Sequence, residues 1–450
     1  MGAFIRKFTS RLSQMQMIAL GFFAIIMIGS LLLMLPIASR SGTVTPFGTT
    51  LFTATSATCV TGLILVDTFT HWSMFGQLVI LCLIQIGGLG FITLGFLFSI
   101  VLKRKIGLRQ RGMLKESVSA LDLSGIVRLA LIILKGTLIF EGAGAIILAI
   151  CFIPKMGLFQ GIYYGIFHSI SAFCNAGFDL MGRFSPFSSL TAYSGNGVVI
   201  LTISALIIIG GIGFFVWSDI RTHKLHIRKY ALHTKIVLLS TFILIAGGAI
   251  LFFFLERQHL FADMSIPEKI FNSIFCAVSP RTAGFNSIDS AALTDSSKLL
   301  TIALMFIGGA PGSTAGGIKV TTMIVLLLYL RTTLTRTEGL NIFKRRIEES
   351  AITKATAVFC INLFASLIAT FLICTIEQLN LIDVVFEVVS AISTVGMTLG
   401  ITPQLALASK IILVFLMYIG RVGSLSFALS FTDKKKLTHI RQPKESISVG

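Results

Sequence analysis

The feature that most constrains the fold of this sequence is a pattern that occurs four times. Each copy contains an apolar stretch, a short amphipathic stretch that ends near a glycine, and a second apolar stretch. The four copies cover residues 12–102, 124–220, 232–332 and 352–431, and basic segments separate them. Internal repeats determine an architecture before any single element is assigned. We therefore expect one structural unit used four times.

Two short motifs recur within the repeats. The first is a turn that ends in Gly62, Gly177, Gly284 or Gly396, preceded in repeats 1, 2 and 4 by "FTATSATCVTG", "FHSISAFCNAG" and "FEVVSAISTVG". The second is one of the strings "IGGLGF", "IGGIGF", "IGGAPG" and "IGRVGS". The turn glycine precedes the first glycine of its string by 25, 33, 24 and 24 residues. These spacings support the alignment of the four repeats.

The apolar stretches predict a membrane protein. The chain has 450 residues, of which 54% are hydrophobic and 12% charged, whereas soluble domains carry about 25% charged residues. Runs such as Met15–Ile37, Gln77–Leu102, Gly197–Trp217 and Lys235–Leu255 reach the roughly 20 residues that a bilayer-spanning helix needs. We expect an all-α polytopic protein in the plasma membrane.

The net charge of +18 lies in blocks between the apolar runs, in segments 103–115, 221–235 and 331–346 and at both ends of the chain. Short positive loops stay in the cytoplasm. The blocks therefore predict a cytoplasmic N-terminus (1–11) and C-terminal tail (432–450), and contacts with the lipid bilayer instead of nucleic acid.

The amphipathic stretches of about ten residues are too short to cross a bilayer. They should enter the membrane from outside and return, which predicts eight transmembrane helices and four re-entrant pore loops around one pseudo-fourfold pore. Non-helical backbone at this depth is tolerated where it lines a cavity. Rings of carbonyl groups select cations, so the polar turns suit an ion.

The sequence offers no support for an enzyme. The seven cysteines have no metal-ligand spacing, and the segment "GGAPGSTAGG" (308–317) lacks the Gly-Lys-Ser/Thr ending of a Walker phosphate loop. A secondary cation transporter with inverted repeats and broken helices is the main alternative, but its repeats would invert, whereas all four repeats here begin inside.

The motifs "ATCVTGL", "SPRTAGFNS", "STAGGIK" and "GRVGSL" resemble the Ktr/Trk/HKT superfamily of potassium transporters, and within it the KtrB membrane subunits of Ktr systems. The resemblance covers essentially the whole chain. It implies potassium as the transported ion, a homodimer, and a separate cytoplasmic nucleotide-binding ring (KtrA-like). It leaves open whether sodium is an activator, a coupled ion or a competing substrate.

The resemblance also implies which residues form the selectivity filter. Gly62 favours potassium, because sodium-preferring relatives carry serine at this position. The implied filter residues are Cys59, Val60, Thr61, Gly62, Cys174, Asn175, Ala176, Gly177, Arg281, Thr282, Ala283, Gly284, Ser393, Thr394, Val395 and Gly396.

Repeat 3 contains five glycines and a proline in residues 308–317, which we call the Gly-rich loop. As one helix, segment 298–332 would be about 52 Å long against a core of about 30 Å, so it must break. One interpretation is a kinked helix with a hinge. The resemblance instead implies an intramembrane gate under the filter, formed by Gly308, Gly309, Ala310, Pro311, Gly312, Ser313, Thr314, Ala315, Gly316, Gly317, Lys319 and Arg421.

Charged residues inside the spans suggest further contacts. Arg421 lies deep in the last apolar run, where a buried arginine needs a partner, and the resemblance places it against the Gly-rich loop. Lys319 could bind loop carbonyls as a structural cap or in gating. For Arg281 and Glu387 we predict a salt bridge between neighbouring repeats that braces the filter; the alternative is separate solvation.

Overall fold

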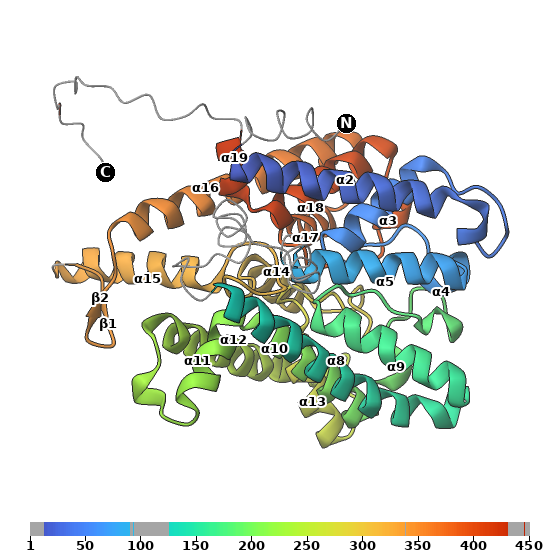
Figure 1. Ribbon diagram of the computed structural model, residues 1–450, viewed down its shortest axis with the longest axis horizontal. Helices are drawn as coiled ribbons and strands as arrows, with labels where there is room; N and C mark the ends of the chain where they lie inside the picture. Colours follow the sequence, from blue (N-terminus) through green and yellow to red (C-terminus); the bar gives the residue numbers. More distant parts are fainter. Residues whose placement is uncertain (1–12, 91–92, 94–125, 338, 431–444, 446–450) are drawn as a thin grey trace.

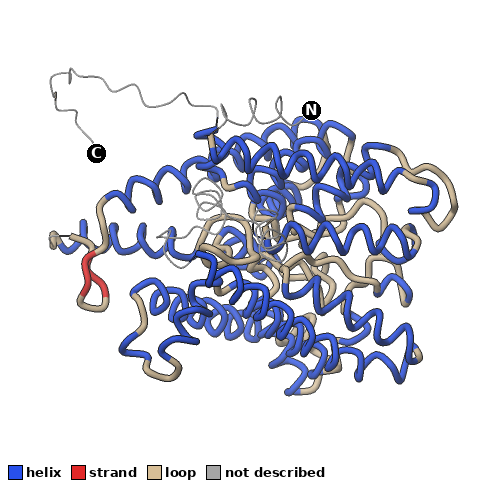
Figure 2. The backbone as a smooth tube through the Cα atoms, viewed as in Figure 1, coloured by secondary structure: helices blue, strands red, loops and turns tan. Residues whose placement is uncertain are grey.

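The computed structural model describes residues 13–90, 93, 126–337, 339–430 and 445. This part of the chain is almost entirely helical, except for loops and a small hairpin of β1 (Asn341–Ile342) and β2 (Arg345–Arg346) (Figure 2). The predicted N-terminal segment 1–11, the basic block 103–115 and nearly all of the tail 432–450 lie outside the described residues.

Four helices in the described part of the chain are long and apolar enough to cross a membrane. Each opens one of the predicted repeats, and large apolar side chains on them are exposed, such as Phe242 at 69% and Phe371 at 71%. A helix that is apolar on all sides belongs in lipid. The predicted class, a helical membrane protein, is confirmed. The helices are α2 (Gln14–Met34), α8 (Ile126–Met156), α12 (Leu232–Glu256) and α16 (Ser350–Ile376).

Each long helix is followed by a shorter helix that packs against it. At 1.5 Å per residue, even the longest of these, with 16 residues, reaches only about 24 Å, less than a bilayer core of about 30 Å. Each ends just before one of the predicted turns. They are α3 (Phe47–Thr58), α9 (Leu158–Phe173), α13 (Ile266–Val278) and α17 (Leu381–Ile392).

A third helix follows each turn and joins neighbouring repeats. These helices are α5 (Met74–Leu89), α10 (Gly197–Gly211), α14 (Asp295–Phe306) and α18 (Leu407–Val422). α5 packs on α9, α10 on α13, α14 on α17, and α18 on α3. Each repeat thus contacts the short helix of the next, and the last contacts the first. The units close into a ring with the loops gathered in the middle (Figures 1 and 2).

The run Gly197–Trp217, predicted as one bilayer-spanning helix, is divided into two helices. α10 ends at Gly211, and the next helix, α11 (Phe214–His223), leaves at an angle of 92°. Of the two residues between them, Gly213 has a φ of +94°, which a right-handed helix cannot accommodate. The corresponding Gly90 and Gly423, with φ values of +80° and +96°, follow the last residues of α5 and α18.

In repeat 3 the same break is longer. α14 ends at Phe306, irregular backbone follows, and α15 (Val320–Thr335) begins after Lys319. Segment 298–332 is therefore broken, and by a loop, not a kink. The total of eight spans stays a prediction, because α5 and α15 are apolar but have only 16 residues each.

The remaining described elements are short. They are η1 (Pro36–Ala38), α4 (Thr68–His71), η2 (Met181–Arg183), η3 (Thr191–Tyr193), η4 (Ile227–Lys229), η5 (Thr402–Gln404) and α19 (Ser424–Ser430). Of these, η4 lies between repeats 2 and 3, and the others lie within the repeats.

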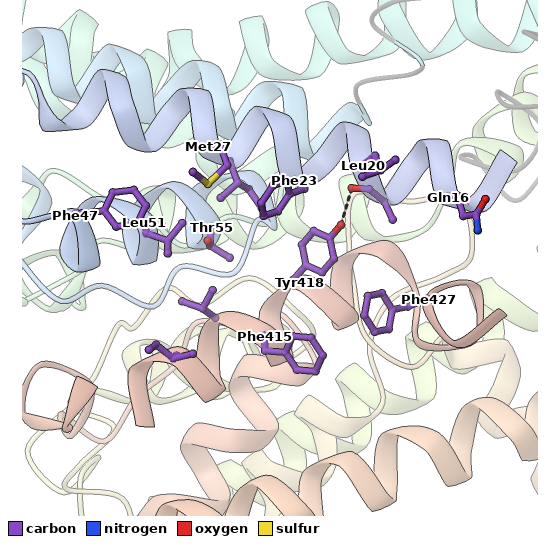
Figure 3. Close-up of a pocket in the computed structure, with 14 residues that line it drawn as sticks. Gln16, Leu20, Phe23, Met27, Phe47, Leu51, Thr55, Phe415, Tyr418 and Phe427 are labelled. Atoms are coloured by element: carbon purple, nitrogen blue, oxygen red, sulfur yellow. Dashed lines mark hydrogen bonds between the residues drawn. The ribbon is translucent and has the colours of Figure 1, made fainter. Parts of the chain in front are cut away.

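An apolar groove lies between repeats 1 and 4, away from the central turns (Figure 3). Its volume is about 810 Å³, and α2, α3, α18 and α19 line it. Tyr418 extends from α18 toward α2 and donates from its hydroxyl to the Ala19 carbonyl oxygen at 2.6 Å (Figure 3). This contact ties the last repeat to the first.

Candidate ion pathway

The four predicted turns share one backbone conformation. We number them turn 1 (59–62), turn 2 (174–177), turn 3 (281–284) and turn 4 (393–396). In each turn the second residue has a positive φ: +56° at Val60, +59° at Asn175, +71° at Thr282 and +51° at Thr394. The fourth is the glycine, with φ between +70° and +98°. When left- and right-handed residues alternate, successive amide groups point to one side of the chain and the carbonyls to the other.

The turn glycines form a closed ring. A Cβ atom added to any of them would clash with a carbonyl oxygen of the next turn. The clashing pairs are Gly62 with Ala176 O at 2.6 Å, Gly177 with Ala283 O at 2.7 Å, Gly284 with Val395 O at 2.4 Å, and Gly396 with Thr61 O at 2.0 Å. Only glycine permits both this backbone and this approach.

The carbonyl groups of the turns accept no hydrogen bond from the part of the chain that the structure describes, although all residues of the four turns are buried. The amide groups, in contrast, are bonded to the preceding helix, as in Thr61 N to Ser56 O and Ala176 N to Ser171 O, both at 2.8 Å. Buried carbonyls are rarely left unpaired. This ring of acceptors suits a cation.

Serines at the end of each short helix hold the turns. Ser56 Oγ accepts from Gly62 N at 3.0 Å, and Ser390 Oγ accepts from Gly396 N at 3.1 Å. Ser171 donates to the Phe178 carbonyl, and Ser279 donates to the matching carbonyl of Phe285. No role for these serines was predicted from the sequence; the available signal was the distance of six residues between serine and glycine in repeats 1, 2 and 4.

In repeats 1, 2 and 4 the first glycine of the string allows the third helix to approach the turn. A Cβ on Gly87 would lie 2.0 Å from Thr58 O, one on Gly210 would lie 2.0 Å from Phe173 O, and one on Gly420 would lie 2.1 Å from Ile392 O. Each of these carbonyls belongs to the last residue of a short helix. All four short helices end at a turn, so the negative ends of their dipoles point toward the ring and favour a cation there.

The Gly-rich loop is fixed to repeat 2 by backbone bonds. Ala310 N donates to Gly211 O at 2.9 Å, and Phe214 N donates to Gly312 O at 2.7 Å. The break between α10 and α11 exposes the backbone groups that make these bonds. The loop is thus an ordered part of the packing and not a loose hinge.

The same loop lies against three of the four turns. Thr314 Oγ1 donates to Phe173 O at 3.2 Å and to Asn175 Oδ1 at 3.3 Å. Gly316 abuts Thr394, since an added Cβ would lie 2.0 Å from its Oγ1, and one on Gly308 would lie 3.3 Å from Thr282 Cγ2. The loop therefore covers the ring on the side of the second-position side chains.

Two basic side chains hold the loop. Arg421 Nη1 donates to Thr314 O at 2.5 Å, and its Nη2 donates to Gly87 O and, at 3.0 Å, to Gly88 O. Lys319 Nζ donates to Ala315 O at 2.6 Å and to Gly316 O at 3.2 Å. Arg421 links the loop to repeat 1, whereas Lys319 bonds only within its own repeat.

The predicted salt bridge between Arg281 and Glu387 is not formed, and this expectation is corrected. Glu387 accepts a hydrogen bond from Thr402, and Arg281 Nη2 donates to Thr241 Oγ1 at 3.2 Å. No ion pair among the described residues joins the two. Each side chain bonds to a threonine of its own repeat, so local partners replace the expected bracing contact.

Comparison with known proteins agrees with this architecture. The TrkH family model, described as a cation transport protein, matches residues 6–440. The potassium/sodium uptake protein NtpJ of Enterococcus hirae is 41% identical over 99% of both chains. The Ktr system potassium uptake protein B of Bacillus subtilis is 40% identical over 98% of this chain and 97% of its own.

The fold matches a solved structure of the same family. The potassium transporter TrkH from Vibrio parahaemolyticus superposes with a TM-score of 0.74 at 19% identity, over 94% of this chain and 86% of that chain. The resemblance to the Ktr/Trk superfamily is therefore confirmed, and the chain is a transporter and not an enzyme. This chain belongs to the TrkH family of cation transport proteins.

Proposed function

We propose that this protein takes up potassium across the plasma membrane through the ring formed by turns 1–4. The observation that carries the proposal is the closed ring of four glycines, lined by buried carbonyl groups without partners in the described structure. Such carbonyls replace the hydration shell of a cation. The two full-length relatives named above are uptake proteins for potassium or for potassium and sodium.

We further propose that the Gly-rich loop is the gate. It covers the ring and is held from two sides by Arg421 and by repeat 2. Its glycines permit the backbone rotation that opening would require. The filter then selects the ion, and the loop determines whether the ion passes.

A separate cytoplasmic subunit would control this gate. We propose a KtrA-like nucleotide-binding ring as this partner, a homodimer of the chain as the membrane unit, and cytoplasmic termini. The support is the similarity to a Ktr system protein and the positive charge of segments 221–235 and 331–346.

The alternative function is that of a cation transporter with a different preference, for sodium or for coupled sodium and potassium. The relative from Enterococcus hirae, named for both ions, favours keeping this alternative. Besides being the preferred ion or a coupled ion, sodium could act as an activator of potassium uptake.

One experiment tests the proposal. The chain is expressed in a bacterium that lacks its own potassium uptake, with and without a nucleotide-binding partner subunit, and growth is measured at limiting potassium. Purified protein in liposomes is then tested for rubidium uptake with and without sodium. We expect growth rescue and uptake that sodium competes with only weakly. Transport of sodium in preference to potassium would contradict the proposal.

A further inference from the structure

A buried polar cluster lies behind turn 2. The Glu141 carboxylate on α8 is 7% exposed and accepts two hydrogen bonds from Gln85 Nε2 on α5, at 3.1 and 3.2 Å. The Cys174 thiol, the first residue of turn 2, faces both: its Sγ lies 3.5 Å from Gln85 Oε1 and 3.9 Å from Glu141 Oε1. These three side chains join repeat 1, repeat 2 and the ring.

The backbone around the cluster is tightly packed. Ser169 on α9 donates to the Glu141 carbonyl oxygen at 2.7 Å. Gly88, on the same helix as Gln85, has no room for a side chain, because an added Cβ would lie 2.6 Å from Cys174 Sγ. The Gly88 carbonyl also accepts from Arg421. The last turn of α5 therefore contacts turn 2 on one side and the arginine that holds the Gly-rich loop on the other.

This cluster breaks the fourfold pattern of the ring. Cys59 holds the position in turn 1 that Cys174 holds in turn 2, and it is equally buried. In the described structure the Cys59 thiol makes no hydrogen bond, and no acidic side chain is bonded to it as Glu141 is to Cys174. A carboxylate inside the membrane is costly and usually functional. In the described structure a buried carboxylate therefore contacts turn 2 but not the matching position of turn 1.

We propose that Glu141 is a positioning residue that determines the ion preference of the ring. Its carboxylate fixes Gln85 and Cys174, and through them the position of the turn 2 carbonyls relative to turn 1. The position of the turn 2 carbonyls bears directly on Gly62, because a Cβ added at Gly62 would lie 2.6 Å from the Ala176 carbonyl oxygen. The inference rests on the proposed function of the ring as a potassium filter.

The test measures ion preference in liposomes, as the ratio of half-saturating concentrations of sodium and potassium. Glu141→Ala removes the acceptor, and we expect this ratio to fall by up to about tenfold, the effect of losing one net hydrogen bond. Glu141→Gln keeps an acceptor for Gln85 in the same shape, and it should retain the wild-type ratio. A purely structural role would change the amount of folded protein and the maximal rate without changing the ratio.

Two further variants complete the test. Thr137→Val alters a buried hydroxyl on the same helix that has no hydrogen-bond partner in the described structure, and it should retain the wild-type ratio. If Glu141→Ala does not fold, the double variant Gln85→Leu, Glu141→Leu decides, because replacing both partners by apolar groups is nearly neutral for stability. It should show the same fall.

Three results would overturn the inference. The first is a wild-type ratio in folded Glu141→Ala or in the double variant. The second is a loss of potassium preference in Glu141→Gln as large as that in Glu141→Ala. The third is an equal loss of potassium preference in Thr137→Val. Wild-type protein without a preference for potassium would contradict the proposed function itself and is recognised before any variant is measured.

Discussion

At the scale of single residues, the turn glycines are required for two separate reasons: the left-handed backbone and the distance to the next turn. Gly396 and Gly400 separate these reasons within one repeat. Their φ values are +89° and +92°, but a Cβ on Gly396 would lie 2.0 Å from Thr61 O, whereas one on Gly400 would meet nothing within 4 Å. The clashing atoms at Gly396 are backbone and cannot move aside as a flexible side chain would.

We therefore expect Gly396→Ala to reduce rubidium uptake by at least about tenfold, because a displacement of about 1 Å at a functional site is costly. Gly400→Ala should retain most of the uptake. A left-handed alanine costs both variants about 1–2 kcal/mol, so the difference in uptake between them reports the effect of the contact within the ring. Equal uptake by both variants, measured in liposomes, would show that the ring does not lie on the ion path.

Gly62 tests the preference of the ring. In Gly62→Ser the Cβ would lie 2.6 Å from Ala176 O and 3.2 Å from the Gly177 Cα, so turns 1 and 2 must separate. A wider ring holds a potassium ion less well, and we expect the ratio of sodium to potassium half-saturating concentrations to fall. Competition between rubidium and sodium measures this ratio. An unchanged ratio would mean that Gly62 is not part of the filter.

At the scale of elements, the turns and the break in segment 298–332 could be predicted from the sequence, whereas the helix ends at Gly90, Gly213 and Gly423 could not. A glycine at a fixed distance from a serine recurs in three repeats, and carbonyl rings require such glycines, so local sequence and function indicate the same residues. The strings "IGGLGF" and "IGGIGF" are apolar and look like continuous spans. Their third glycine ends or breaks the helix with a positive φ. At Gly213 it also admits the Gly-rich loop, since an added Cβ would lie 2.8 Å from Pro311 O.

The charged residues show the same limit. A buried arginine in the last span predicts a partner, and the structure gives Arg421 carbonyl partners in both repeat 1 and the Gly-rich loop. The salt bridge between Arg281 and Glu387 was predicted from their opposite charges alone. The threonines that they contact are neutral and carry no signal that a sequence pattern could detect.

The Gly-rich loop yields a prediction at this scale. Deleting Ser313–Ala315 removes Thr314, and with it the bonds to turn 2 and the acceptor for Arg421. We expect a several-fold higher rate of rubidium uptake with an unchanged preference among cations. Arg421→Ala should act in the same direction and more weakly, because the bonds between the loop and repeat 2 remain. Lower uptake by a folded deletion variant would mean that the loop supports the pore instead of closing it.

At the scale of the whole molecule, the ring fixes the orientation of the repeats. Each third helix contacts the short helix of the next repeat, and α18 returns to α3. Four identical contacts of this kind close only if the units are related by rotation about one axis, which places every long helix in the same direction. We therefore predict that segments between repeats lie on one side of the membrane and segments that follow the turns lie on the other.

This arrangement predicts where the loops can be labelled. Leu225, in the basic segment between repeats 2 and 3, is 92% exposed, and Ser185, in the segment after turn 2, is also exposed. An impermeant thiol reagent added to intact cells should therefore label Ser185→Cys but not Leu225→Cys. Permeabilised cells should label both, which shows that Leu225→Cys is reactive, and the wild-type chain gives the background from its own cysteines. Labelling of Leu225→Cys in intact cells would place the basic segment outside, and a ring of four parallel units with positive loops in the cytoplasm could not then be correct.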